Sequence, residues 1–267
     1  MTLAVAVVCQ DGVVVAADSR TTLTMHGMVR VGSDFTHKVF QSGRVAIATF
    51  GDAFVLDRSV ASHMAEFAAV EQGNCDHPGP TARRLAEFMG ERCDREPAGE
   101  PLALSFLVGG YDDAGIGEAW QVSLPDRAIW RVACTAEGGG AVWEGQTEVV
   151  DRILMGYHGV LLDQLASLSG RRTELGAVLP LLEACGYRVP YESMNLQDGI
   201  DLAVFCIRTT IDVQRLTLGT IATSPEFSWP GVGGPIEIAT VTAADGFAWV
   251  QRTRVQGERP AGLAEGA

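Results

Sequence analysis

The second residue of the chain, Thr2, carries both groups that a self-activating nucleophile needs once Met1 is removed. Its hydroxyl can then attack a carbonyl carbon, and its newly exposed α-amine can accept the hydroxyl proton. An α-amine has an ordinary pKa of about 7.7–8.0, so much of it is neutral near physiological pH and able to act as a base. The type and position of this residue predict nucleophilic catalysis by an N-terminal threonine.

Two charged residues further along the chain can complete such a site. Asp18 ends the second arm of a predicted hairpin, which returns the chain to Thr2, and Lys38 is expected on a neighbouring strand. A lysine ammonium favours the developing alkoxide, and a carboxylate offsets the cost of burying that ammonium. Taken singly, the three residues also fit an ordinary chain start, a solvated turn and an exposed strand lysine. Together they predict a catalytic group, with Gly51 as the backbone N–H donor to the oxyanion.

The strands that must position these residues are visible in the hydrophobic pattern. Residues 3–9 and 13–17 are apolar on both faces and flank Asp11-Gly12, a strong hairpin signal. Further strands are expected at 29–31, 38–41, 45–49, 102–108, 119–123, 128–134, 235–241 and 247–250. The spacing of apolar residues predicts helices at 52–72, 81–94, 138–155, 173–184 and 195–216.

The order of these elements indicates the fold class. Strands and helices come in blocks without βαβ alternation, which predicts an α+β protein and argues against a doubly wound parallel sheet. Strands that are apolar on both faces need cover on each side. We therefore expect a four-layer αββα sandwich, in which two stacked antiparallel sheets are flanked by helices. Residues 1–250 should form this single domain, and residues 251–267 a flexible C-terminal tail.

Composition narrows the range of partners. A net charge of −13 argues against a nucleic-acid or anionic-membrane surface. The six cysteines form no CxxC pair and the five histidines no ligand spacing, so we expect reduced thiols, no metal and no cofactor. There is neither an apolar run of transmembrane length nor the basic start of a signal peptide, which predicts a cytoplasmic protein.

Several segments, taken together with Thr2, resemble one known family. The stretches DGVVVAADSRTT (11–22), KVFQ (38–41) and FGDA (50–53) resemble proteasome β-type subunits, and GGPIEIATVTAADG (233–246) is similar to the last core strands of that family. The resemblance therefore spans most of the chain. It implies the fold of N-terminal-nucleophile hydrolases and a threonine-type endopeptidase, and on it the chain is identified as a divergent bacterial proteasome homologue.

The resemblance also implies roles for individual residues. Thr2 matches the nucleophile, and Asp18 and Lys38 match its polar partners. Gly51 matches the oxyanion donor, with Thr49 as a second match for that position. Thr22 matches a position whose backbone pairs with an extended substrate, a mode that reads peptides without regard to their sequence. Thr49 and Ala53 match residues that line the pocket for the residue before the cut. The glycine-flanked serine of the family matches 138–140, where no serine stands, and its Asp-x-x-Ser-Gly element is absent.

The resemblance further implies partners: polypeptide substrates, a homo-oligomeric ring or double ring, and an ATP-dependent unfoldase. Two other functions stay open at this stage. One is a non-catalytic scaffold like the α-type proteasome subunits, although those carry a helical extension before the first strand, whereas here the strand begins at Leu3. The other is an amidase acting on a small molecule, because a fold of this class does not fix the substrate.

Overall fold

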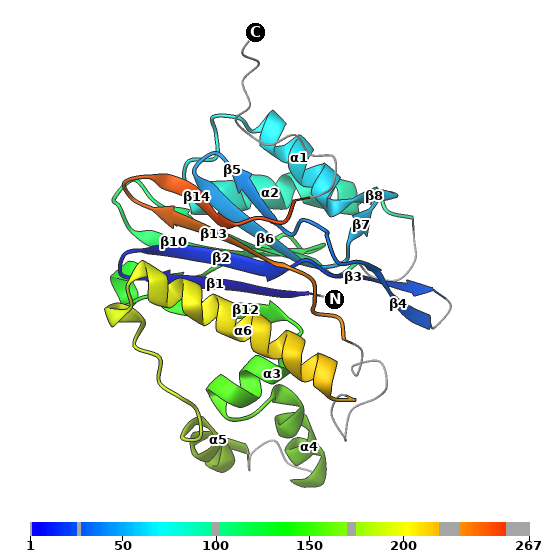
Figure 1. The fold of residues 1–267 in the computed structure, drawn as a ribbon, viewed down its shortest axis with the longest axis vertical. Coiled ribbons are helices and arrows are strands. Elements are labelled where there is room, and N and C mark those ends of the chain that lie inside the picture. Colours follow the sequence, from blue (N-terminus) through cyan, green and yellow to red (C-terminus); the bar gives the residue numbers. More distant parts are fainter. Residues whose placement is uncertain (1, 26–27, 98–101, 170–174, 219–229, 255–267) are drawn as a thin grey trace.

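The computed structural model describes residues 2–25, 28–97, 102–169, 175–218 and 230–254. These residues form a mixed α+β fold around two five-stranded antiparallel sheets (Figure 1), which confirms the predicted class at that level. The first sheet has the order β12-β1-β2-β13-β14: Gly140–Gly145, Leu3–Cys9, Gly12–Asp18, Ile236–Thr242 and Gly246–Gln251. The second has the order β11-β10-β9-β6-β5: Ala128–Cys134, Gly117–Leu124, Leu104–Tyr111, Val45–Gly51 and Val39–Ser42.

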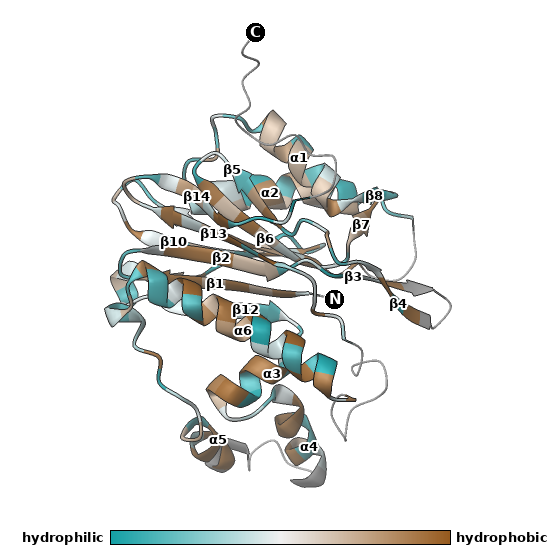
Figure 2. Ribbon diagram, viewed as in Figure 1, coloured by the Kyte–Doolittle hydropathy of each residue, from teal (hydrophilic) through white to brown (hydrophobic). Residues whose placement is uncertain are grey.

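The predicted hairpin of β1 and β2 lies inside the first sheet. Cys9 pairs with Gly12 across the turn, and Ala4 pairs with Ala17 near the open end. Every residue of both strands is buried, and Figure 2 shows the two strands hydrophobic along their length. The register brings Asp18, the last residue of β2, beside the first residues of β1.

Three apolar layers hold the molecule together. One fills the space between the two sheets, with Ala17, Val39 and Leu107 among its members. A second lies between the second sheet and the helices α1 (Val60–Val70) and α2 (Pro78–Cys93). The third lies between the first sheet and α6 (Leu196–Leu216), a helix that begins at an Asn195–Asp198 capping box. The outer faces of both sheets are thus covered, which explains why their strands lack a polar side.

The first helix is shorter than the pattern predicts. A helix was expected from residue 52, but the chain first makes two short strands, β7 (Phe54–Val55) and β8 (Arg58–Ser59). Leu56 and Asp57 adopt positive φ angles of 49° and 60° in the turn between them, a conformation that no helix contains. The helix starts only at Val60, where the Ser59 side chain accepts a hydrogen bond from the Ser62 N–H.

The prediction of a helix from residue 138 is wrong. Gly138 and Gly139 have φ angles of 90° and 78°, which end the turn after β11, and residues 140–145 form β12 beside β1. Gly145 lies opposite Leu3 at a φ of 99°, where any side chain would collide with the Thr2 carbonyl. The glycines therefore serve a close approach of strands. Helical structure begins only with α3 (Glu148–Val150).

Three further parts complete the described chain. Strands β3 (Thr21–Met25) and β4 (Met28–Ser33) form a separate hairpin. Helices α4 (Gly159–Ser169) and α5 (Leu175–Glu183) lie beyond α3, and only α5 was predicted. Of the expected tail, residues 255–267 fall outside the described residues, whereas Gln251 still belongs to β14. Among the described helices, none combines the length and hydrophobicity needed to cross a membrane.

Candidate active site

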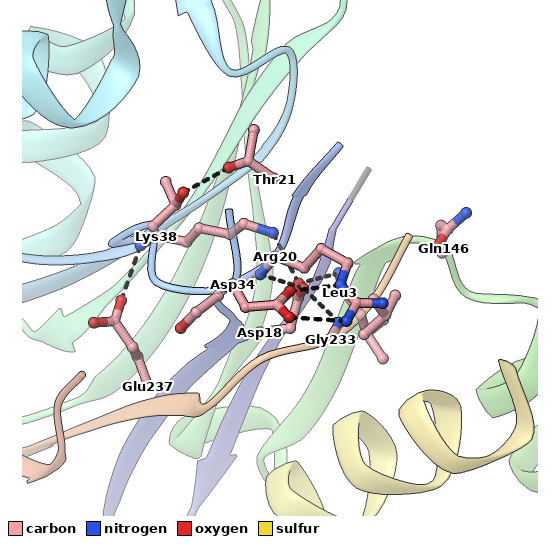
Figure 3. A network of polar contacts seen from close by, with 12 residues as sticks. Leu3, Asp18, Arg20, Thr21, Asp34, Lys38, Gln146, Gly233 and Glu237 are labelled. Atoms are coloured by element: carbon pink, nitrogen blue, oxygen red, sulfur yellow. Dashed lines mark hydrogen bonds and ion pairs between the residues drawn. The ribbon is translucent and has the colours of Figure 1, made fainter. Parts of the chain in front are cut away.

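Asp18 is the centre of a buried hydrogen-bond network at the end of β2 (Figure 3). Its Oδ1 accepts from the Leu3 N–H and from the Lys38 Nζ, each at 3.0 Å. Its Oδ2 accepts from the N–H groups of Arg20 and Gly233, also at 3.0 Å. Four donors around one buried carboxylate give both of its oxygens two hydrogen-bond partners each. The network joins the chain start, the end of β2, the approach to β5 and the approach to β13.

Lys38 lies between β4 and β5, with its ammonium turned to Asp18 and its side chain only 6% exposed. Burial lowers the pKa of Lys38, and this is the largest influence on it. The negative charges of Asp18 and Glu237 raise the same pKa, and Arg20 lowers it. Lys38 is thus a buried cation whose proton is held less firmly than that of a surface lysine.

Thr2 and Lys38 line one open pocket. Thr2 is 4% exposed. The lining also includes the predicted pocket and oxyanion residues Thr49, Gly51 and Ala53. Asp18 is fully buried and is not among the lining residues, but it bonds the Lys38 ammonium. The structure therefore gathers six of the seven predicted site residues, five around the pocket and Asp18 behind them.

Thr22 is the residue that the structure places elsewhere. It pairs with Val31 inside the β3–β4 hairpin, and Thr21 lines the pocket in its stead. A shift in the register of that hairpin falls between Thr21 and Thr22, so the two residues pair differently with β4. A role of the Thr22 backbone in binding substrate remains a prediction.

Gly51 has a geometric reason to be glycine. It ends β6 with a φ of 96°, and a side chain at this position would collide with the Ala103 carbonyl. A residue with a Cβ would push the strand out of place. The backbone at the mouth of the pocket is therefore fixed where an oxyanion donor is expected.

Sequence reasoning did not identify Glu237, a fully buried carboxylate on β13. It accepts hydrogen bonds from the backbone N–H groups of Lys38 and Val39, at 2.9 and 3.1 Å. His37, which lines the pocket, places its Nδ1 2.6 Å from the other carboxylate oxygen. The signal was present: a single acidic residue interrupts the apolar strand PIEIATV. A charge in such a strand needs partners.

Sequence reasoning also missed neutral amide groups that hold the backbone of Thr2. The Gln146 N–H donates to the Thr2 carbonyl at 2.8 Å. The Gln146 side-chain oxygen accepts from Gln214 Nε2 on α6 at 3.0 Å, and Gln214 Oε1 accepts from the Val232 N–H at 3.0 Å. Val232 precedes Gly233, which donates to Asp18. The amide contacts and the charged network therefore meet in one loop.

The stacked antiparallel sheets, their covering helices and the site at the end of the hairpin are consistent with a proteasome-like N-terminal-nucleophile fold. Solved structures of Anbu proteins are similar to this chain. The Anbu complex of Pseudomonas aeruginosa, a helical assembly, matches with a TM-score of 0.59 at 16% identity, over 96% of this chain and 88% of that chain. Anbu from Hyphomicrobium sp. strain MC1 has a TM-score of 0.54 at 16% identity, over 93% and 85%. Anbu (ancestral beta-subunit) from Yersinia bercovieri has 0.53 at 14% identity, over 93% and 87%.

These matches correct the family expected from the sequence. The assignment to the proteasome β-type subunits is wrong, because the similar structures belong to Anbu, a distinct proteasome-related family. At 14–16% identity the likeness shows the fold alone. No protein-family model and no curated protein matches the sequence. The hairpin and its DSR motif thus identify the fold, and they do not distinguish the related families that share it.

Proposed function

We propose that the chain is an N-terminal-nucleophile threonine hydrolase of the Anbu type, which cleaves peptide bonds through Thr2 after removal of Met1. The observation that carries the proposal is the buried Lys38–Asp18 pair, 3.0 Å long, with Lys38 and Thr2 lining one pocket. A buried ion pair is seldom a gain in stability over apolar packing. A role in activating the Thr2 hydroxyl, which faces the same pocket as Lys38, gives the pair a purpose.

The composition of the chain supports the same role for Lys38. It is the only lysine among the 20 Lys and Arg residues of the sequence. Arginine carries its charge on a broad, planar guanidinium, whereas lysine carries it on a compact ammonium. The chain therefore uses arginine for its other strongly basic side chains and places its one lysine at the candidate site.

The proposed reaction follows from the chemistry of these groups. The Thr2 α-amine takes the hydroxyl proton, directly or through a water, while the Lys38 ammonium favours the alkoxide. The Thr2 Oγ1 attacks the substrate carbonyl, and the Gly51 N–H donates to the oxyanion that forms. The protonated α-amine then gives its proton to the leaving amine as the C–N bond breaks. Water activated by the same amine hydrolyses the resulting ester and restores Thr2.

Substrate binding and assembly are proposed on separate grounds. Thr49 and Ala53 line the pocket and would contact the residue before the cut, and the Thr22 backbone would pair with an extended peptide. We propose a homo-oligomer, because the Anbu complex of P. aeruginosa forms a helical assembly. Electron microscopy of the purified protein distinguishes a ring from a helix.

We also propose that the three core layers belong to a four-layer αββα sandwich formed by residues 1–250 as one domain.

The experiment that tests this function is intact-mass measurement after exposure to an epoxyketone, which reacts with a free N-terminal threonine. We expect a species without Met1 that gains one adduct and hydrolyses fluorogenic peptides. Thr2→Ala should abolish both the adduct and the peptide hydrolysis. Thr2→Ser should retain part of each, because serine keeps the hydroxyl and the amine. Thr210→Ala removes a buried threonine that bonds only within α6 and is the matched control. Full turnover by Thr2→Ala would refute the mechanism, and an adduct without peptide cleavage would point to a smaller amide substrate.

A further inference from the structure

Glu237 is a buried carboxylate that the proposed mechanism leaves without a role. It lies opposite Ala17 in the first sheet, and Ala17 belongs to the apolar layer between the sheets. A carboxylate in such surroundings is strongly unfavourable unless every oxygen is bonded. Glu237 meets that need with three groups: the N–H of Lys38, the N–H of Val39 and Nδ1 of His37. All three belong to the segment that carries the candidate lysine.

The two ends of Lys38 are held by carboxylates from neighbouring strands (Figure 3). Glu237 on β13 bonds the backbone from which the side chain extends, at 2.9 Å. Asp18 on β2 bonds the ammonium at the far end, at 3.0 Å. Strands β2 and β13 are paired over six residues, so the two carboxylates keep a fixed separation. The position of the ammonium relative to Thr2 therefore depends on both.

We propose that Glu237 is a positioning residue for the Thr2 reaction, which holds the backbone of Lys38 in place and adds a second negative charge near its side chain. Glu237 acts through Lys38 and does not itself contact the substrate. The same carboxylate holds His37, so it also fixes one wall of the pocket. The inference rests on the proposed function and adds a residue to it from the opposite end of the chain.

The charges around Lys38 give the sign of the expected effect. The titratable and charged groups around Lys38 come from its own segment and from the elements packed against it. They are His37, Asp34, Asp18, Arg20, Glu237 and, once Met1 is removed, the α-amine of Thr2. Burial lowers the pKa of Lys38, and the charges of Asp18 and Glu237 raise it. Removing the charge of Glu237 therefore lowers the pKa further, so the ammonium loses its proton at a lower pH.

Because the chain has a single lysine, the change in the pKa of Lys38 can be measured without an activity assay. Protein grown with ¹³C-labelled lysine gives one side chain to follow by NMR, so the pH titration of Lys38 needs no assignment. We expect the midpoint to move to lower pH in Glu237→Gln, which keeps the shape and removes the charge. Glu118→Gln is the matched control: Glu118 is also a buried glutamate on a strand, but it bonds Trp120 and Arg131 in the other sheet. Its midpoint should coincide with that of the unmodified protein.

Turnover supplies the second readout. In Glu237→Gln the alkaline limb of the pH–rate profile should move in the same direction as the NMR midpoint. Glu237→Asp keeps the charge and shortens the reach, so its midpoint should stay near the original while kcat falls by about 100-fold, as expected for a displacement of about 1 Å. A merely structural role for Glu237 would lower stability and leave the midpoint of Lys38 unmoved.

The two hypotheses fail in different ways. If the unmodified protein shows no Thr2-dependent turnover, the proposed function fails, and the NMR titration still decides whether Glu237 controls Lys38. If turnover depends on Thr2 but the midpoint is the same in Glu237→Gln and Glu118→Gln, the inference about Glu237 is overturned. Should Glu237→Gln not fold, Glu237→Asp carries the test, and unchanged kcat in that variant overturns the inference as well.

Discussion

Two regions meet at Thr2, and they hold it by opposite means. On one side lie charged groups, the Lys38–Asp18 pair and Glu237, which are buried and bonded to one another and to backbone N–H groups. On the other side lie neutral amides. The backbone N–H of Gln146 donates to the Thr2 carbonyl, and the Gln214 side chain joins the Gln146 side chain to the Val232 N–H. The charged region can change the ionisation of a reacting group, whereas the amide region can only fix its position.

The difference suggests a division of labour in the proposed reaction. The Thr2 amine must remain neutral for part of the cycle if it is to act as a base. A carboxylate on the amide side would favour the charged amine and oppose that role. Neutral amides orient the backbone and add no charge. Substitutions on either side test this division, and their expected effects differ in size.

The largest effect is expected from Lys38. Lys38→Met keeps the length of the side chain and removes its charge, so kcat/KM should fall by about 10³-fold, since both alkoxide stabilisation and proton transfer are weakened. The fold should survive because Asp18 keeps three backbone N–H donors. Lys38→Arg should also lose most activity, because the planar guanidinium is bulkier than the ammonium and cannot take its enclosed place beside Asp18.

Peptidase kinetics and circular dichroism of the purified variants check this prediction. Arg44→Ala is a control for the loss of a cation, because Arg44 bonds the Ala243 carbonyl at an exposed site. A loss below tenfold in Lys38→Met would mean that the lysine does not assist the nucleophile. Retained activity in Lys38→Arg would mean that a fixed positive charge is enough.

A smaller effect is expected on the amide side. Gln214→Ala removes the link between Gln146 and Val232, which should cost about 1–2 kcal/mol of stability and reduce kcat by about tenfold through a less well fixed Thr2. Gln146→Ala removes the same hydrogen bond from the other end, so the double variant should lose less than the sum of the two single changes.

A double-mutant cycle in kcat and in denaturant unfolding measures this coupling. Gln197→Ala, an exposed glutamine at the start of α6 that bonds Asp201, is the control. Strictly additive effects would show that Gln146 and Gln214 act separately. A loss as large as that of Lys38→Met would contradict the division between a chemical and a positional side.

The two regions also differ in how far the sequence predicts them. The charged side depends on a local hairpin, so the Asp-Gly turn and its apolar arms suffice to bring Asp18 back to the chain start. The amide side depends on β12, which pairs with β1 across more than 130 residues and begins at glycines that were interpreted as the start of a helix. Glu237 is the long-range member of the charged side. The sequence shows an acidic residue within an apolar strand, but it does not show that its partner is Lys38, 199 residues away.

The interpretation at family level shows a similar limit. The motifs around Thr2, Asp18 and Lys38 describe a fold and a chemistry that related families share, so they could not separate a proteasome β-type subunit from Anbu.

The smallest effect is expected at the rim of the charged side, where Arg20 and Asp34 form a two-point ion pair at 2.6 and 3.1 Å. The hydrogen bond from Arg20 lowers the pKa of Asp34, more than burial raises it. A carboxyl with a lower pKa in the folded state stabilises the protein above its ordinary pKa of about 3.9, and this contribution is lost as pH falls through the lowered pKa. Asp34→Asn should therefore be less stable near neutral pH, by about 1 kcal/mol or less because the Asp34 side chain is 36% exposed.

The gap in the free energy of unfolding between Asp34→Asn and the unmodified protein should close as pH falls below the ordinary range of the carboxyl. Urea unfolding at a series of pH values measures it. Arg20 also donates to the Pro230 carbonyl and so keeps a second anchor, which is why kcat should change little in this variant. A gap that persists in acid would show that Asp34 acts by shape rather than by charge. A large fall in kcat would move the ion pair from the rim of the charged region into its centre, beside Lys38.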